Sequence, residues 1–211
     1  PLGRYNDLPD RAFYLEALAF LTGIGVIAPN SDGGFAPDEP VTRNDFAVWT
    51  ARSLGLSPVP GTAFTDVSAS SAEAPYIHAL HQAGFVRGYG DGTFRGDRTI
   101  TRAEAAMMLA GITGRPAAPG HAAAFADVRA DDWFAGAVGV LANLRVVSGK
   151  SKDAFAPGDT LTRGEAAALL YRLLFEVRRI EALDGETVTI GGHRYRWDRS
   201  LSGLFWEGNR E

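Results

Sequence analysis

The 17 residues GYGDGTFRGDRTITRAE, Gly88 to Glu104, decide the fold, because their key positions recur twice more in the chain. A Gly-rich loop leads into Phe94, and the pair Thr101-Arg102 then precedes an apolar helix. Asp66 lies 28 residues before Phe94 and 36 residues before Arg102. The same two offsets occur in the other copies: Asp7, Phe35 and Arg43, then Asp127, Phe155 and Arg163. Constant offsets in three copies indicate a tandem repeat.

Each copy has the same predicted layout of helix, loop and helix. The first helix is amphipathic, with an apolar face expected from Phe13, Ala17, Phe20 and Ile24 in copy one and from Phe134, Val138 and Leu141 in copy three. A Gly-rich loop follows, and its aromatic residue (Phe35, Phe94 or Phe155) is expected to fill the core. The sequence therefore predicts a mostly α fold.

The second helix of each copy has a clear start signal. Thr101-x-x-Glu104 and Thr162-x-x-Glu165 are typical of a capping box, in which Thr accepts from the third helical N–H and Glu accepts from the N–H of the cap. Copy one has Asp45 three residues after its Thr, and this shorter side chain reaches back less easily. Three helices are thus predicted to begin at the Thr-Arg pairs.

Pro-containing stretches at 55–63 and 114–124 predict linkers between the copies. We place the copies at 4–55, 64–114 and 125–175. Residues 176–211 differ, because Thr187–Ile190, Gly191-Gly192 and Arg194–Trp197 predict a β-hairpin or the start of a further β domain. A two-helix copy is marginal alone, whereas stacked or circularised copies share a core.

Composition excludes several classes of function. A net charge of −4 leaves no basic patch for nucleic acid, and the absence of Cys excludes disulfides and Cys-based zinc sites. No apolar run approaches the roughly 20 residues of a membrane span. No signal peptide is visible, and Pro1-Leu2-Gly3 resembles the remainder of a tag-cleavage site. Without a nucleophile elbow, phosphate loop or paired-His zinc motif, we expect no catalysis, cofactor or metal.

The opening Phe64–Val67, the loop Gly88–Phe94 and the string Ile100–Glu104 resemble the S-layer homology repeat, and the resemblance covers residues 5 to 175. It implies three repeats in a pseudo-threefold spindle. It also implies extracellular anchoring to the bacterial cell wall or S-layer, through a secondary cell-wall polysaccharide or another peptidoglycan-linked glycan. Pyruvylated N-acetylmannosamine would lie in grooves between the repeats, and the pyruvyl carboxylate would meet Arg43, Arg102 and Arg163.

A different class of function stays open beside this one. The chain could be a structural module of a surface lattice that binds protein and no glycan. Self-assembly through regions outside this sequence is compatible with either function. Binding to isolated cell-wall polymer would separate the two.

An Arg directly after a helix cap needs a reason, because the N-terminus of a helix carries about half a positive charge. One reading is an anion site, in which orphan N–H groups, the helix dipole and the guanidinium converge on one carboxylate. The other reading is an internal salt bridge to Asp7, Asp66 or Asp127. Arg102 is expected to matter most for binding, since its copy combines the full Gly-rich loop with a capping box.

Five further residues are candidates for ligand contact, and three of them have a structural alternative. Asp66 and Asp127 could touch sugar hydroxyls or cap a helix or turn. Trp133 could stack on a sugar or pack in the core. Gly88 and Gly149 lie in the candidate binding loops, whereas copy one has Pro29 at that position and is expected to diverge first.

Overall fold

The computed structural model describes residues 2–116 and 125–177, together with strand residues 183–184, 187–190, 193–198 and 203–206. A short 3-10 helix, Leu2–Arg4, comes first. The α-helices that follow are α1 Leu15–Gly23, α2 Arg43–Ser53, α3 Ala74–Gln82, α4 Arg102–Ile112, α5 Ala135–Asn143 and α6 Arg163–Val177. The described part of the chain is mostly α, as predicted.

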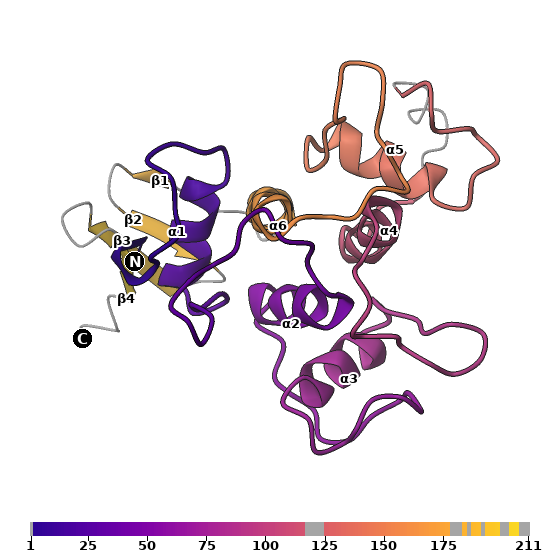
Figure 1. Ribbon diagram of the computed structural model, residues 1–211, viewed down its shortest axis with the longest axis horizontal. Coiled ribbons are helices and arrows are strands. Elements are labelled where there is room, and N and C mark those ends of the chain that lie inside the picture. Colours follow the sequence, from indigo (N-terminus) through magenta and orange to yellow (C-terminus); the bar gives the residue numbers. More distant parts are fainter. Residues whose placement is uncertain are drawn as a thin grey trace. The chain divides into compact units, whose positions relative to one another are not determined.

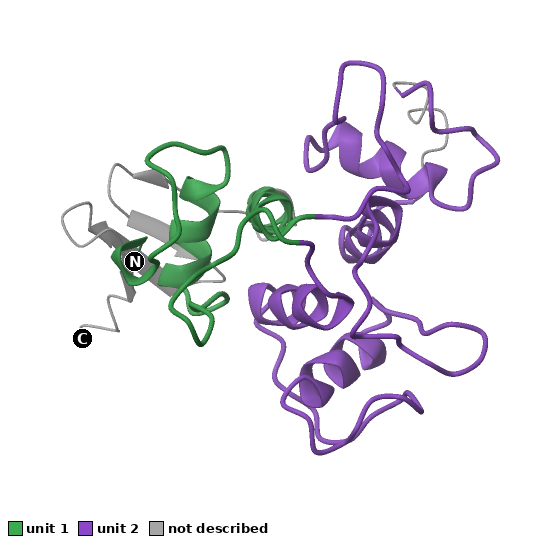
Figure 2. Ribbon diagram, in the orientation of Figure 1, with its two compact units in different colours: residues 1–39, 162–211 green, residues 40–161 purple. Residues whose placement is uncertain are grey.

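Helices pair between copies. The second helix of one copy packs against the first helix of the next, so that α2 contacts α3 and α4 contacts α5 (Figure 1). In the same way α6, from copy three, contacts α1 of copy one. Two compact units result: residues 1–39 with 162–211, and residues 40–161 (Figure 2). The boundaries of these units therefore fall inside copies one and three.

A ring of three main-chain hydrogen bonds joins the copies within residues 40–161. Val41 N–H donates to Leu161 O at 2.9 Å, Leu161 N–H donates to Ile100 O at 3.0 Å, and Ile100 N–H donates to Val41 O at 3.2 Å. All three side chains are fully buried. Each residue lies 34 positions after the Asp of its own copy, so equivalent residues make equivalent bonds.

The core contains the aromatic residues that the repeat predicts. Phe35, Phe94 and Phe155 are fully buried, as are Val138 and Leu141 on the predicted face of α5. The prediction that Phe13 lies on the apolar face of the first helix in copy one is wrong. Phe13 precedes α1, which begins at Leu15, and its side chain is 67% exposed.

The aspartate of each copy holds the aromatic residue in place, which explains the offset of 28 residues. Phe94 N–H and Arg95 N–H each donate to Asp66 at 2.7 Å. Arg95 has a φ of 56°, a left-handed conformation that costs free energy for a residue with a side chain. The carboxylate stabilises this turn. The same contacts occur in the other copies, from Phe35 and Ala36 to Asp7 and from Phe155 and Ala156 to Asp127.

The predicted helix caps are present. Thr101 Oγ1 accepts from Glu104 N–H at 3.2 Å, and Glu104 Oε2 accepts from Thr101 N–H at 2.9 Å. Thr162 and Glu165 make the same reciprocal pair. In copy one, Thr42 Oγ1 accepts from Asp45 N–H at 3.0 Å.

Four strands follow α6: β1 Leu183–Asp184, β2 Thr187–Ile190, β3 His193–Asp198 and β4 Gly203–Trp206. They pair antiparallel in chain order, with Ile190 opposite His193. The tight turn predicted at Gly191-Gly192 lies outside the described residues, so the hairpin stays a prediction. Within the described part of the chain, no helix combines the length and apolar character of a membrane span.

Candidate functional site

The first amide groups of α2, α4 and α6 are already used within the protein. Arg43 N–H and Asn44 N–H donate to Arg98 O and Gly96 O, both at 2.8 Å. The equivalent amides of α4 donate to Asp159 O and Pro157 O, and those of α6 donate to Glu39 O and Pro37 O. The third amide of each helix is taken by the Thr cap. The predicted anion site at orphan helix amides is therefore wrong in this respect, because these amides have main-chain acceptors.

The guanidinium of Arg102 links copy two to copy three by hydrogen bonds. Its Nε donates to Phe155 O at 2.8 Å and its Nη2 donates to Ser148 O at 2.7 Å, while its Cζ lies 4.7 Å from the centroid of the Phe155 ring. Arg163 repeats this pattern on copy one, where Nε donates to Phe35 O at 2.7 Å. Each Arg thus meets the loop of another copy.

This pairing corrects the premise on which Arg102 was expected to dominate. The full Gly-rich loop at Gly88–Phe94 and Arg102 belong to the same copy, but the Arg102 side chain does not bind that loop. Arg102 contacts the loop of copy three, and the rings of Tyr89 and Phe94 in the full Gly-rich loop contact Arg43.

Arg43 is held less completely than Arg102. Its side chain is only 8% exposed, and among the described residues it makes one hydrogen bond, from Nη2 to Arg87 O at 3.2 Å. The Nε atom is buried and has no partner in that part of the chain. The guanidinium carbon stacks 4.6 Å from the centroid of Phe94 and lies 5.5 Å from that of Tyr89. A buried cationic donor without an acceptor is costly, so the protein holds this guanidinium with fewer hydrogen bonds than that of Arg102.

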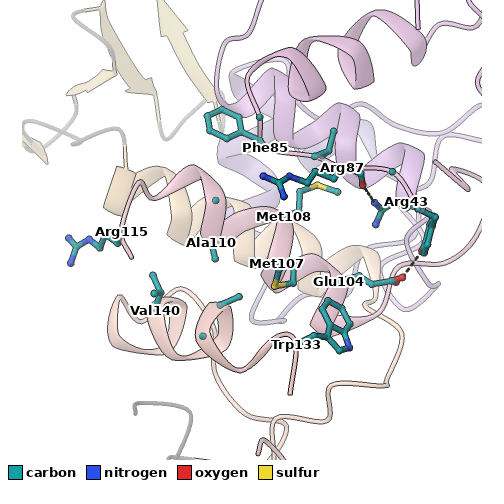
Figure 3. Close-up of a pocket in the computed structure, with 17 residues that line it drawn as sticks. Arg43, Phe85, Arg87, Glu104, Met107, Met108, Ala110, Arg115, Trp133 and Val140 are labelled. Carbon is teal, nitrogen blue, oxygen red and sulfur yellow. Dashed lines mark hydrogen bonds between the residues drawn. The ribbon is translucent and has the colours of Figure 1, made fainter. Parts of the chain in front are cut away.

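Arg43 lines a cavity of about 670 Å³ within residues 40–161 (Figure 3). One wall is the segment 84–89 of copy two, the second is a face of α4, and the third is Trp133 with a face of α5. The residues of α4 in this wall run from Glu104 through Met107 to Gly111, and Arg115 follows just beyond the helix. The cavity therefore joins residues from all three copies.

Tyr89 and Glu104 organise the end of the cavity near Arg43. Tyr89 Oη donates to Glu104 Oε1 at 2.7 Å, and Glu104 Oε2 accepts from Thr101. Burial works against ionisation of Glu104, but these hydrogen bonds outweigh it and lower its pKa. Burial lowers the pKa of Arg43, while Tyr89 and Glu104 act in the opposite direction. Arginine keeps its charge under such shifts, so the cavity holds a permanent cation.

Two apolar side chains are exposed at the same cavity. Trp133 is 63% exposed and Met107 is 42% exposed. The core alternative for Trp133 is therefore wrong, whereas Trp49, which lies within α2, is buried. An exposed indole at a polar cavity offers a flat apolar face and one N–H donor. The structure thus brings Trp133 together with Arg43, which lies 90 residues earlier in the chain.

Of the remaining candidates, Gly88 lies in the cavity wall, whereas Asp66, Asp127 and Gly149 do not line the cavity. A Cβ on Gly88 would meet Phe64 Cε1 at 2.5 Å, and one on Gly149 would meet Phe125 Cε1 at 2.9 Å, so close packing requires both glycines. Asp66 and Asp127 hold their loops, which is the turn-capping alternative. Sequence reasoning did not identify Tyr89, Met107 or Arg115, although Tyr89 stood inside the quoted loop.

Comparison with known families agrees with this geometry. The profile described as S-layer homology domain matches residues 4–47, 63–106 and 124–167. The chain belongs to this family. Its three S-layer homology domains begin near Asp7, Asp66 and Asp127, as the repeat offsets predicted.

Curated relatives include proteins of several kinds. The S-layer homology region is 32% identical over 59% of this chain to the surface layer protein of Brevibacillus choshinensis, and 31% identical over 61% to the cellulosome-anchoring protein of Acetivibrio thermocellus. It is also 29% identical over 81% to the amylopullulanase of Thermoanaerobacterium thermosulfurigenes. The chain spans 12%, 30% and 9% of the lengths of these relatives, in that order.

Proposed function

We propose that this chain anchors a protein at the bacterial cell surface by binding an acidic cell-wall polysaccharide in the cavity beside Arg43. The observation that carries the proposal is the Arg43 guanidinium, which belongs to a residue lining that cavity, stacks on Phe94 and makes one side-chain hydrogen bond among the described residues. Family membership and the relatives named for the surface layer and for anchoring support a role at the cell wall.

A carboxylate on the glycan fits this cation best. Arg43 can give a planar oxyanion two parallel N–H donors, and such charge-assisted pairs are stronger than neutral hydrogen bonds. Stacking on Phe94 fixes the plane of the guanidinium before ligand arrives, which reduces the ordering cost of binding. Pyruvylated N-acetylmannosamine, which the family resemblance implies, carries such a carboxylate.

Trp133 supplies the second element of the proposed contact. A sugar ring has an apolar face, and the exposed indole can cover it at low entropy cost because it has only two rotatable side-chain bonds. In this proposal Asp66, Asp127 and Gly149 hold their loops without lining the cavity, and Gly88 forms part of its wall. Arg102 and Arg163 take part less, because their Nε atoms already donate to carbonyl groups.

The deciding experiment is calorimetric titration of the chain with purified cell-wall polymer, with and without its pyruvyl groups. We expect binding to the pyruvylated polymer that falls at least tenfold when the pyruvyl groups are removed. Arg129→Gln is the control for loss of a charge, because exposed Arg129 pairs with Asp131 and does not line the cavity. If neither polymer bound and a surface-lattice protein did, the chain would be an assembly module.

A further inference from the structure

The cavity beside α4 has a cation at each end. Arg43 lies where α4 begins, next to Tyr89 and Glu104, and Arg115 lies just after α4 ends. Figure 3 shows the two side chains at opposite ends of the row of lining residues, with Met107, Met108 and Ala110 labelled between them. The helix from Glu104 to Ile112 rises about 12 Å, so the two cations are separated by more than one residue of a polymer.

The charge of the cavity differs from that of the chain. Arg43, Arg87 and Arg115 line it with one acidic residue, Glu104, which gives a formal charge of +2 where the whole chain carries −4. Both oxygens of Glu104 already accept hydrogen bonds, from Tyr89 and Thr101. The positive lining selects anionic ligands, and the apolar wall between its ends suits sugar faces.

We propose that this cavity binds a segment of acidic glycan with two anionic groups, the first at Arg43 and the second at Arg115. The proposal rests on the proposed function, since it extends the same site. A single charged sugar occupies the Arg43 end and leaves the Arg115 end empty. A longer segment reaches both cations, lies along Met107 and Met108, and binds more tightly.

Arg115 differs from Arg43 in the strength expected of its contact. It is exposed, so water and salt screen its charge, and exposed ion pairs contribute little individually. Its effect on affinity is therefore expected to be roughly two- to fivefold and to shrink as ionic strength rises. Its role is to set the length and charge spacing of the glycan that the cavity prefers.

The test uses two fragments of the pyruvylated cell-wall polymer, one with a single pyruvylated residue and one with two. Affinities for the whole chain are measured by calorimetry at low and high salt. Arg115→Gln should weaken the two-charge fragment roughly two- to fivefold and leave the one-charge fragment unchanged. Arg43→Gln should weaken both fragments, and Arg129→Gln should weaken neither. Melting curves of all variants check that the fold is kept.

The possible failures are distinct. If Arg43→Gln weakens both fragments while Arg115→Gln changes neither, the second contact is overturned and the proposed function stands. If the unmodified chain binds neither fragment, the proposed function fails and the inference fails with it. If a polyglutamate peptide competes as well as the two-charge fragment, the cavity recognises charge spacing without a glycan, which also overturns the inference.

Discussion

Arg43 and Arg102 both begin a helix, and both stack on the buried Phe of the following copy, at 4.6 and 4.7 Å. Arg102 has short hydrogen bonds to Phe155 O and Ser148 O. Arg43 has one bond of 3.2 Å and a buried Nε without a partner in the described chain. One position in the repeat thus supports two roles: Arg102 joins copies, whereas Arg43 is held mainly by ring contacts and can accept a ligand.

The loops that these residues meet also differ. The loop of copy two contains Tyr89, whose hydroxyl donates to Glu104 and whose ring lies 5.5 Å from Arg43 and 4.1 Å from Arg95. Copy three has Lys150 at the position of Tyr89. The aromatic ring at this position can stack on a cation, whereas the Lys side chain has no ring and cannot. The divergence between copies therefore lies in the loop rather than in the Arg.

The largest effect is expected on stability, from Arg102→Ala. Two charge-assisted hydrogen bonds to main-chain carbonyls are lost in a buried site, so the free energy of unfolding should fall by about 3 kcal/mol. Arg43→Ala should cost about 1 kcal/mol, because one long hydrogen bond is lost. Urea unfolding followed by circular dichroism measures both. Equal losses would mean that the two guanidinium groups have the same structural role.

Binding should show the reverse order. Arg43→Ala should weaken binding of a short pyruvylated fragment by roughly 10- to 150-fold, the range for a hydrogen bond to a charged group. Arg43→Lys should restore it only in part, since an ammonium lacks the planar fork of donors. Arg102→Ala should change this affinity less than threefold, or about 0.6 kcal/mol. Calorimetry on the folded variants measures these affinities. A larger loss of affinity in Arg102→Ala than in Arg43→Ala would place the main binding site at Arg102 and the loop of copy three.

Sequence reasoning identified what depends on local pattern. The caps at Thr101 and Thr162, the helix starts and the buried Phe residues all follow from short-range chemistry within a copy. It could not identify which loop each Arg meets. The constant sequence spacing within each copy does not show whether an Arg contacts the loop of the same copy or of another copy. Arg102 was therefore paired with the Gly-rich loop of copy two, to which it belongs.

The candidate site was predicted only in its parts. Arg43 and Trp133 were named as candidates. Their proximity depends on the packing of α4 against α5, which no local sequence pattern indicates. The use of the helix amides by another copy was also invisible, because main-chain acceptors have no sequence signature. Phe13 was misplaced because a periodic pattern was extended two residues beyond the true start of α1.

The next effect is a dependence of stability on pH that the loops of copies two and three share. Burial opposes ionisation of Asp66 and Asp127, but backbone hydrogen bonds outweigh it and lower both pKa values. A lowered folded pKa adds stability that is complete above the unfolded pKa, near 3.9, and is lost as pH falls through the folded value. The free energy of unfolding should therefore stay level from pH 7 to about 5 and decline below about 4.

Substitution at these residues provides the control. Asp66→Asn should cost about 1 kcal/mol at pH 7, because exposed carboxylate hydrogen bonds are partly replaced by water, and should make the acid decline shallower. Asp127→Asn should do the same for the loop of copy three. Asp131→Asn should change stability by less than about 0.5 kcal/mol, since Asp131 is exposed. A decline that keeps its slope in both loop variants would contradict the assignment.

The smallest effect concerns the residue after the first helix of copies two and three. Gly84 and Arg145 occupy equivalent positions with φ of 77° and 57°, and a side chain in this conformation costs about 1 kcal/mol or more. Arg145 is exposed, and no atom lies within 4 Å of a Cβ built on Gly84. Arg145→Gly should therefore raise the free energy of unfolding by about 0.5–1 kcal/mol, and Gly84→Ala should lower it by about 1 kcal/mol. Arg145→Ala keeps the strained backbone and should change nothing. If Arg145→Ala stabilised as much as Arg145→Gly, removal of the charge and not release of backbone strain would be responsible.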